Sequence, residues 1–458
     1  MLDSTEANRL AADLMKSATP EWARLRKYVR YARGKQALPW LPEGAESEYR
    51  DIAPKSASNW IDLVIRSTTE GLILDGYGDS EGGTAVWRDA WQANGMDARQ
   101  HALHRAAGTL GYSFVIVLPA DDGRVWMRPE AATSMYAEYD DPSDEWPRHA
   151  IRELSVKGRG NTRTGRWELY TDEARYILTG QLGGATVEVL EHDLAVCPVV
   201  RMLWQIDLLG DPMGEVEPVI PMQDRIVDAT FTLQMAAKYG AFPQRWIAGI
   251  NPGEPLRDPE TNEPLLDGAG NPIMPTIKAY IDHIILAADP TTKFGQFEAA
   301  DLNQYVAALE AHIRHLAAIT QTPPHYLLGS LVNLSAEALA AAEAGLQRKI
   351  REKREVLGEG YEQALRLAAQ VLGQDVAADD TSSQVHWQDV ESRSLAQVAD
   401  ALLKLGQLGV PAKMLFQMIP GWSKDDADEA AAMLESGSPI DRLAEALGAG
   451  LEPAPAAA

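Results

Sequence analysis

Residues 317–350 of the chain read AAITQTPPHYLLGSLVNLSAEALAAAEAGLQRKI and contain the ends of two helices. Apolar residues at helical spacing lead into this stretch from residue 302, and Thr322-Pro323-Pro324 ends that helix because proline cannot continue it. The segment 321–335 has no formal charge. Ser335 is then a plausible N-cap for a helix over 336–372. The stretch therefore predicts two helices joined by a loop over 321–335.

Helices are predicted on the N-terminal side, over about 58–74 and 97–109, before a β-rich region. From residue 112 the apolar period changes to two, and Asp122-Gly123 predicts a hairpin after the strand Tyr112–Leu118. Further strands are predicted over 150–157, 166–171, 174–179, 186–190 and 196–203. Together these patterns indicate an α+β fold.

A helix is predicted over 215–239, with Pro218 and Pro221 in its first turns, where proline is tolerated. Residues 251–275 hold six of the 27 prolines, with a hairpin expected around Asp267-Gly268 and a strand over 276–286. Loops this long are uncommon and usually functional. Asp301 is a plausible N-cap for the helix over 302–320.

The C-terminal region from residue 373 has 14 acidic and five basic residues, a net charge of −9. Short amphipathic helices fit 392–406, 411–418, 424–435 and 439–447, and the Ala/Pro-rich end is expected to be disordered.

The composition excludes several classes of protein. Among 458 residues, 66 are acidic and 42 basic, so the net charge is −24, which argues against a general nucleic-acid binder. The single cysteine, Cys197, excludes an intrachain disulfide and a four-cysteine metal site, and favours a reducing compartment. Neither a secretory signal nor an apolar run of about 18 residues is evident, so we expect no membrane span.

No enzyme motif is convincing. Walker A, HExxH and GxSxG patterns are absent, and Gly158-Arg159-Gly160 is interpreted as a hairpin turn. The pairs His101/His104 and His312/His315 have helical i,i+3 spacing, but no carboxylate or cysteine completes a metal set. We therefore expect packing or surface histidines, with no catalytic residues, metal or cofactor.

Three features leave alternatives open. The basic cluster of residues 24–33 is either a solvated helix face or a contact with a partner or DNA. The basic run Arg348, Lys349, Arg351, Lys353 and Arg354 is either a salt-bridged helix face or a contact with an acidic neighbouring copy. The segment 321–335 is either an ordinary connection or a functional loop.

The order of these elements resembles the portal proteins of tailed bacteriophages, of the siphophage type that infects actinobacteria. The matching segments are EWARLRKYVRYARGKQALPWLP with ASNWIDLVIRSTTEGLILDGY, WQANGMDARQHALHRAAGTLGYSFVIVLP, VIPMQDRIVDATFTLQMAAKYGAFPQRWIAG and AAITQTPPHYLLGSLVNLSAEALAAAEAGLQRKI. These segments follow one another in the family's order over about 330 residues, and the region after 373 matches weakly.

The resemblance implies a non-enzymatic ring, usually of twelve subunits, at one capsid vertex of the virion. Double-stranded DNA would pass through it during packaging and ejection. It also implies docking of the terminase large subunit and later of head–tail connector proteins, contacts with major capsid and scaffolding proteins, and assembly in the host cytoplasm.

The resemblance also assigns parts of the portal fold to this chain. The wing would comprise helices in 1–111 and the β-rich region 112–214, and the stem helices 215–241 and 299–320. The clip would be 242–298, the tunnel loop 321–335, the long helix at the junction of wing and crown 336–373, and the acidic crown 374–458. The candidate DNA-facing residues of the tunnel loop are Gln321, Thr322, His325, Tyr326, Ser330 and Asn333.

The tunnel loop carries no full positive charge, which suits a conduit, because phosphate affinity grows with each contacting Lys or Arg. Two other functions stay open at this point. One is an internal capsid or scaffold-associated binding protein without a channel. The other is a hydrolase or transferase that uses one of the histidine pairs.

Overall fold

The computed structural model describes most of the chain. The described residues are 1–41, 47–78, 81–158, 164–205, 207–240, 245–248, 255, 258, 261–268, 270–272, 293–296, 301–329, 336–389 and 395–435. They fall into two compact units. The first comprises Met1–Leu38, Ala57–Val227 and Glu310–Ala458, and the second comprises Pro39–Ser56 and Asp228–Leu309.

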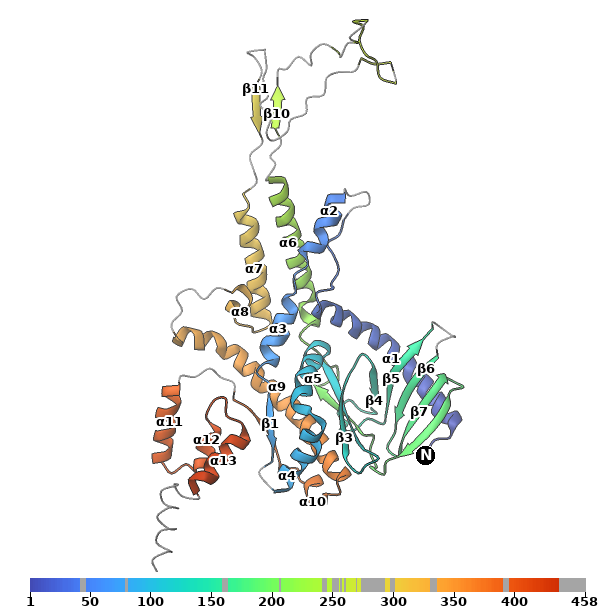
Figure 1. The fold of residues 1–458 in the computed structure, drawn as a ribbon, viewed down its shortest axis with the longest axis vertical. Coiled ribbons are helices and arrows are strands. Elements are labelled where there is room, and N and C mark those ends of the chain that lie inside the picture. Colours follow the sequence, from blue (N-terminus) through green and yellow to red (C-terminus); the bar gives the residue numbers. More distant parts are fainter. Residues whose placement is uncertain are drawn as a thin grey trace, which may run out of the picture. The chain divides into compact units, whose positions relative to one another are not determined.

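The first unit contains a five-stranded antiparallel sheet in the order β4-β5-β6-β7-β8 (Figure 1). Its strands are β4 Met135–Glu138, β5 His149–Lys157, β6 Thr164–Tyr170, β7 Ala174–Gln181 and β8 Thr186–Glu191. Helix α1 (Ser4–Ala32) begins at Asp3, whose side chain accepts hydrogen bonds from the backbone of Thr5 and Glu6. Small and apolar residues of α1 pack with Trp167 and Leu169 of β6, so this helix covers the apolar side of the sheet.

A second, three-stranded antiparallel sheet has the order β3-β2-β9, from β2 (Tyr112–Pro119), β3 (Val125–Ala131) and β9 (Val199–Leu203). The Asp122-Gly123 hairpin between β2 and β3 is confirmed, with Pro119 opposite Val125. The core beside this sheet is completed by α5 (Met96–Leu110) and by α9 (Ala336–Val371).

Helix α9 agrees closely with the helix predicted over 336–372. Its Leu346, Ile350, Leu357, Tyr361 and Leu365 are buried, as the apolar stripe of the sequence requires. Tyr361 lies in the same core as Trp91, which belongs to a π-helical turn (Trp87–Trp91) after α4 (Glu81–Val86). The π turn was not predicted.

Two strands far apart in sequence form a small sheet. Strand β1 (Leu74–Tyr77) pairs antiparallel with β12 (Val385–Trp387). This pairing explains why α3 (Trp60–Thr69) ends before the predicted residue 74. The short helix α10 (Asp375–Ala378) precedes β12, and α11 (Leu395–Gln407), α12 (Ala412–Gln417) and α13 (Lys424–Glu435) follow it.

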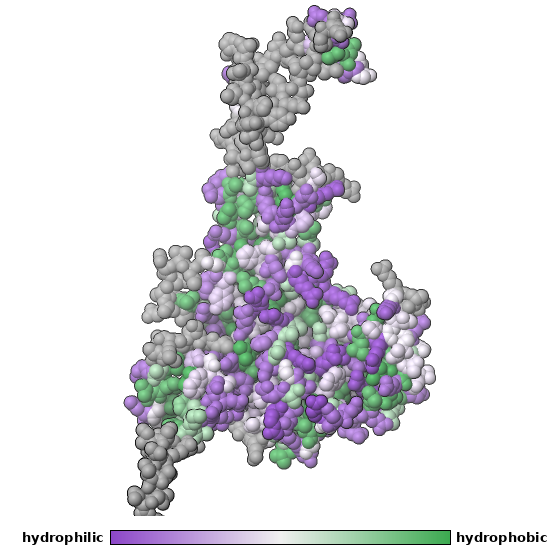
Figure 2. All heavy atoms as spheres, viewed as in Figure 1, coloured by the Kyte–Doolittle hydropathy of each residue, from purple (hydrophilic) through white to green (hydrophobic). Residues whose placement is uncertain are grey.

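The helices predicted over 392–406, 411–418 and 424–435 correspond to α11, α12 and α13. Apolar residues gather over α12 and α13 in the space-filling view (Figure 2), where Met414, Met433 and Leu434 are more than half exposed. The prediction for 439–447 lies outside the described residues.

The second unit contains α2 (Ser47–Ile52), the C-terminal part of α6 (Ile220–Gly240) and the first residues of α7 (Asn303–Ile319). The backbone N–H of Asn303 donates to the side chain of Asp301, so Asp301 supports the start of α7 from one residue before the N-cap position, because the helix begins at Asn303. Strands β10 (Arg245–Ala248) and β11 (Lys293–Gln296) pair antiparallel. A bridge between Leu266 and Pro272 confirms a turn near Asp267-Gly268, whereas 276–286 lies outside the described residues.

Candidate functional site

The segment after α7 is partly helical, which corrects the prediction of a loop over the whole of 321–335. Helix α8 (Pro324–Leu328) follows Pro323, and Gly329 ends it with φ +67°, donating its backbone N–H to the carbonyl of His325. Proline at the first helical position is preorganised for a helix, so Pro324 favours the start of α8. Helix α7 already ends at Ile319, after which Gln321 takes a left-handed φ and the backbone N–H of Thr322 donates to the carbonyl of Ala317. The remaining 330–335, which includes Ser330 and Asn333, lies outside the described residues.

The four described tunnel-loop candidates differ in exposure. Gln321 is exposed, with the left-handed φ of +53°, and Tyr326 is 40% exposed. Thr322, in contrast, is only 2% exposed, and its hydroxyl lies 3.0 Å from that of Thr320. Thr322 is therefore a poor DNA-facing candidate in this structure, because its polar group is used inside the protein.

His325 and Tyr326 both point toward one carboxylate of α9. The Tyr326 hydroxyl donates to Glu343 Oε1 at 3.3 Å, and His325 Nε2 lies 3.8 Å from the same oxygen. Partial burial, together with the Glu343 charge, raises the pKa of Tyr326. These contacts tie α8 to the first turns of α9 without adding a free positive charge.

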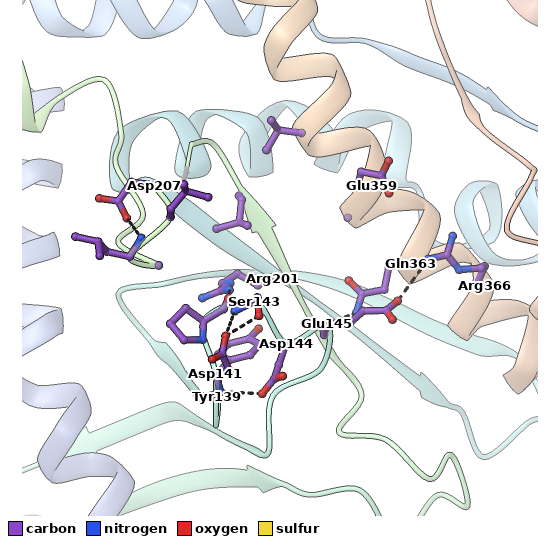
Figure 3. Close-up of a pocket in the computed structure, with 17 residues that line it drawn as sticks. Tyr139, Asp141, Ser143, Asp144, Glu145, Arg201, Asp207, Glu359, Gln363 and Arg366 are labelled. Carbon is purple, nitrogen blue, oxygen red and sulfur yellow. Dashed lines mark hydrogen bonds and ion pairs between the residues drawn. The ribbon is translucent and has the colours of Figure 1, made fainter.

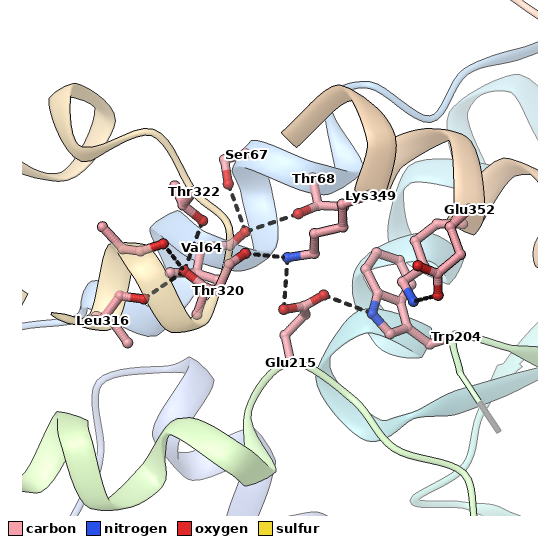
Figure 4. A network of polar contacts seen from close by, with 12 residues as sticks. Val64, Ser67, Thr68, Trp204, Glu215, Leu316, Thr320, Thr322, Lys349 and Glu352 are labelled. Carbon is pink, nitrogen blue, oxygen red and sulfur yellow. Dashed lines mark hydrogen bonds and ion pairs between the residues drawn. The ribbon is translucent and has the colours of Figure 1, made fainter. Parts of the chain in front are cut away.

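Lys349 of α9 forms a buried ion pair next to the end of α7 (Figure 4). Lys349 Nζ lies 2.8 Å from Glu215 Oε2 and donates to the carbonyl of Thr320 at 2.9 Å. The indole N–H of Trp204 donates to the other oxygen of Glu215 at 2.9 Å. One buried cation therefore links the segment before α6, the end of α7 and the long helix.

Some side chains of the basic run 348–354 are buried in the protein and others are exposed to solvent. Lys353 is 2% exposed and pairs with Glu352 at 2.7 Å, while Arg354 donates to the carbonyls of Gly71 and Gln388, each at 2.8 Å. Lys349, Lys353 and Arg354 have partners in their own chain, which fits the alternative of a salt-bridged helix face for these three residues, and the contact of the run with a neighbouring copy stays a prediction.

Arg348 and Arg351 are the exposed members of the run. They form no ion pair with the described part of the chain. These two residues keep the role of interface candidates.

Among the described residues, neither histidine pair belongs to a cluster of three or more His, Cys, Asp or Glu suited to a metal. His104 is fully buried, and its Nε2 lies 2.8 Å from the Tyr361 hydroxyl. Burial lowers the pKa of His104 to about 3, so it is a neutral packing residue, as predicted. Cys197 is also buried, and burial raises the pKa of its thiol.

A cavity of about 890 Å³ lies beside α9, and sequence reasoning did not find it (Figure 3). Carboxylates dominate its charged lining: Asp141, Asp144, Glu145, Asp207 and Glu359. Arg201 lies 4.1 Å from the Tyr139 ring and donates to the carbonyl of Pro142 at 2.9 Å. These residues come from the loop before β5, from β9 and the loop after it, and from α9, which lie far apart in sequence, so no local motif could indicate the cavity. The helices in the described part of the chain include none long and apolar enough to cross a membrane.

Comparisons with known proteins give a consistent family. The sequence model described as "Phage portal protein, SPP1 Gp6-like" matches residues 52–440. The portal protein of Mycobacterium phage D29 is 32% identical over 362 residues, covering 75% of this chain and 71% of the relative. The portal protein of Mycobacterium phage L5 is 31% identical over 389 residues, covering 80% of this chain and 76% of the relative.

Among solved structures, a chain from the virion of a native gene transfer agent particle aligns with a TM-score of 0.45 and 14% identity, covering 86% of this chain and 98% of that chain. A chain from the neck of a native gene transfer agent particle, computed with C12 symmetry, aligns with a TM-score of 0.44 and 12% identity, covering 84% and 94%.

Proposed function

The chain belongs to the SPP1 Gp6-like family of phage portal proteins, and from this membership we propose how its parts serve a portal. A portal is the ring at one capsid vertex through which double-stranded DNA is packaged and ejected, and this is the function of the chain. The family match over residues 52–440 carries this conclusion, because it includes both the β-rich region and the segment between α7 and α9.

We propose a ring of twelve copies, with the terminase large subunit docking during packaging and head–tail connector proteins later. In this proposal 1–111 and 112–214 form the wing, and 215–241 and 299–320 form the stem. The clip is 242–298, the tunnel loop 321–335, the long helix 336–373, and the crown 374–458. The portal family is structural, and we propose that this chain has no enzymatic activity of its own.

The proposed DNA-facing surface is the polar part of the tunnel loop. Gln321 and Tyr326 supply its exposed described part, whereas the His325 side chain is only 9% exposed. Ser330 and Asn333 stay candidates and lie outside the described residues. Two facts support a weakly binding lining: the loop carries no Lys or Arg, and the nearest buried cation, Lys349, is neutralised by Glu215. Such a lining suits a conduit because the affinity for DNA grows with each phosphate that a cation contacts.

The experiment that tests the ring is a mass measurement by light scattering, with negative-stain images of the same fraction. We expect a closed ring of twelve copies with a central hole, either in the purified chain or after co-expression with its major capsid and scaffolding proteins. A small closed oligomer that neither concentration nor those proteins enlarge would contradict the proposal and favour a capsid-associated protein without a channel.

A further inference from the structure

The loop Asp207–Asp211, between β9 and α6, exposes two adjacent leucines. Leu208 and Leu209 have relative exposures of 105% and 80%. Single exposed apolar residues are common on protein surfaces, but two large ones at the tip of one loop form a small apolar projection. Asp207 and Asp211 flank the two leucines and are themselves exposed. The loop therefore combines an apolar tip with two carboxylates.

Hydrogen bonds hold this loop in one conformation. Asp207 Oδ1 accepts from the backbone N–H of Leu209 at 2.9 Å and of Asp211 at 3.0 Å. The N–H of Gly210 donates to the carbonyl of Asp207 at 3.1 Å, and Gly210 has φ +90°. Both side-chain bonds end on Oδ1, so Asp207 Oδ2 can accept from a partner. A loop ordered in this way loses little entropy when it binds.

The Asp207–Asp211 loop also packs against another segment of the chain, near Arg201 (Figure 3). A Cβ atom at Gly210 would collide with the ring of Pro142, so the backbone of the loop lies directly against that proline. Pro142 is in turn held by the hydrogen bond from Arg201, whose guanidinium stacks on Tyr139. These contacts fix the conformation of the turn from which the two leucines project.

A complementary stripe lies on the exposed face of α9. Ala341, Ala344, Arg348 and Arg351 follow one another at intervals of three, four and three residues, which places them on one face of a helix. All four are exposed. The stripe presents two small apolar side chains and then two guanidinium groups that pair with no described carboxylate of the chain.

We propose that the Asp207–Asp211 loop of one subunit docks on the Ala341–Arg351 stripe of the next subunit. The leucines would cover the alanines, and the aspartates would face the arginines. This inference rests on the proposed ring. Loop and stripe are different surfaces of one chain, so their contact is heterologous, and contacts of this type form a ring when the rotation between copies closes.

Charge favours a second copy as the occupant of the stripe. Each chain carries −24, so neighbouring copies repel unless their contacts are locally complementary. The loop supplies negative charge and the stripe supplies exposed positive charge without an internal partner. The surface area that one loop can bury is much smaller than the roughly 800 Å² that a stable interface buries on each partner. Its role is therefore to fix the register between subunits within a larger interface.

Cross-linking between two chains that each carry one introduced cysteine tests the contact directly. One chain carries Leu208→Cys and the other, with a distinguishable tag, carries Ala344→Cys, while the native Cys197 is 1% exposed and protected. In mixed rings treated with a short bis-maleimide, we expect a cross-linked heterodimer that carries both tags. A chain that carries both Leu208→Cys and Ala344→Cys should give a series of cross-linked oligomers that extends to the closed ring. The control pairs Leu208→Cys with Val189→Cys, an exposed residue of β8.

The outcomes separate this contact from the ring itself. Rings without the heterodimer, or with equal cross-linking of the Val189→Cys control, would overturn the docking and leave the portal ring intact. A wild-type chain that forms no ring, even with its capsid and scaffolding proteins, would overturn the ring and the docking together. A Leu208→Cys adduct with capsid protein instead of a second copy would also overturn the docking as proposed.

Substitution gives an independent measurement. We expect Leu208→Ser with Leu209→Ser to raise the protein concentration for half-maximal ring formation at least tenfold. Val189→Ser with Leu190→Ser, also an adjacent exposed apolar pair, should change that concentration less than twofold.

Asp211→Arg should also weaken assembly, and Arg348→Asp in the same chain should restore it. An effect of Asp211→Arg that Arg348→Asp does not reverse would contradict the pairing of loop and stripe.

Discussion

At the scale of single residues, Lys349 is the most consequential cation of the basic run. It is 7% exposed and faces Glu215, which is also largely buried. Lys349→Met removes the positive charge and leaves the Glu215 carboxylate buried without its ion-pair partner. Breaking such a pair costs about 3–5 kcal/mol, and we expect a loss of this size in the free energy of unfolding of the chain, measured by urea titration.

Two further variants make this measurement specific. Lys16→Met changes an exposed lysine of α1, and its effect should stay within about 0.5 kcal/mol. Lys349→Met combined with Glu215→Gln should recover much of the loss, because the amide still accepts from Trp204 but carries no charge. Equal effects of Lys349→Met and Lys16→Met would mean that the buried pair contributes nothing.

The basic run shows what sequence alone can establish at this scale. The density of positive charge over 348–354 is visible in the sequence, and so is the apolar line through Leu346, Ile350 and Leu357. The burial of Lys349 is not visible, because it depends on Glu215 and Thr320, which only the tertiary fold brings near. The same limit applies to Thr322, whose polarity suggested a DNA-facing position although its hydroxyl is inside the protein.

At the scale of elements, the docking of α13 on β1 should depend on pH. The Asp75 carboxylate of β1 accepts from the backbone N–H of Lys424 at 3.1 Å, at the start of α13. Burial raises the pKa of Asp75 to about 6. The negative charge of Asp425 also raises this pKa, whereas Lys424 lowers it. The folded state therefore binds a proton more tightly than the unfolded state, so this contribution to stability is full below about pH 4 and is lost as pH rises through 6.

We therefore expect α13 to dock more tightly at pH 5 than at pH 7.5. Hydrogen–deuterium exchange of residues 424–435, corrected for the intrinsic pH dependence of exchange, should be slower at pH 5. Asp75→Asn keeps an acceptor for the Lys424 N–H but does not titrate, so its protection should be nearly the same at both pH values. A wild-type segment that exchanges faster at pH 5 would show that another group dominates.

The elements also show why some predictions succeeded. Helix α9 and the β2–β3 hairpin were predicted to within a few residues, because their signals, the 3.6-residue apolar period and Asp122-Gly123, are local. The β1–β12 sheet was missed, since its short strands lie far apart in sequence. Helix α8 was missed because Pro323-Pro324 was interpreted only as the end of α7, although proline is also favoured at a helix start.

At the scale of the whole molecule, assembly and folding should respond to different arginines of α9. Arg348→Glu with Arg351→Glu reverses two exposed charges, so we expect weaker ring formation by light scattering and an unchanged melting temperature of the single chain. Arg354→Glu should lower the melting temperature instead, because Arg354 holds the carbonyls of Gly71 and Gln388. A reduced melting temperature for the Arg348/Arg351 variant would contradict this separation.

The assembled ring offers a test of the channel lining. Gln321→Lys with Tyr326→Lys, repeated in every subunit, adds cations to the surface proposed to face DNA. If four of them contact phosphates, the logarithm of DNA affinity should gain a slope of about −3.6 against the logarithm of salt concentration, a loss of roughly a hundredfold between 50 and 200 mM salt. Wild-type rings should bind DNA weakly, and phage carrying the variant should eject DNA more slowly.

Thr186→Lys with Val189→Lys places the same charge on β8 and should change neither DNA affinity nor ejection rate, because that strand belongs to the proposed wing. Equal effects of the two variants would show that added charge alone is responsible, and no effect of the first would remove Gln321 and Tyr326 from the channel.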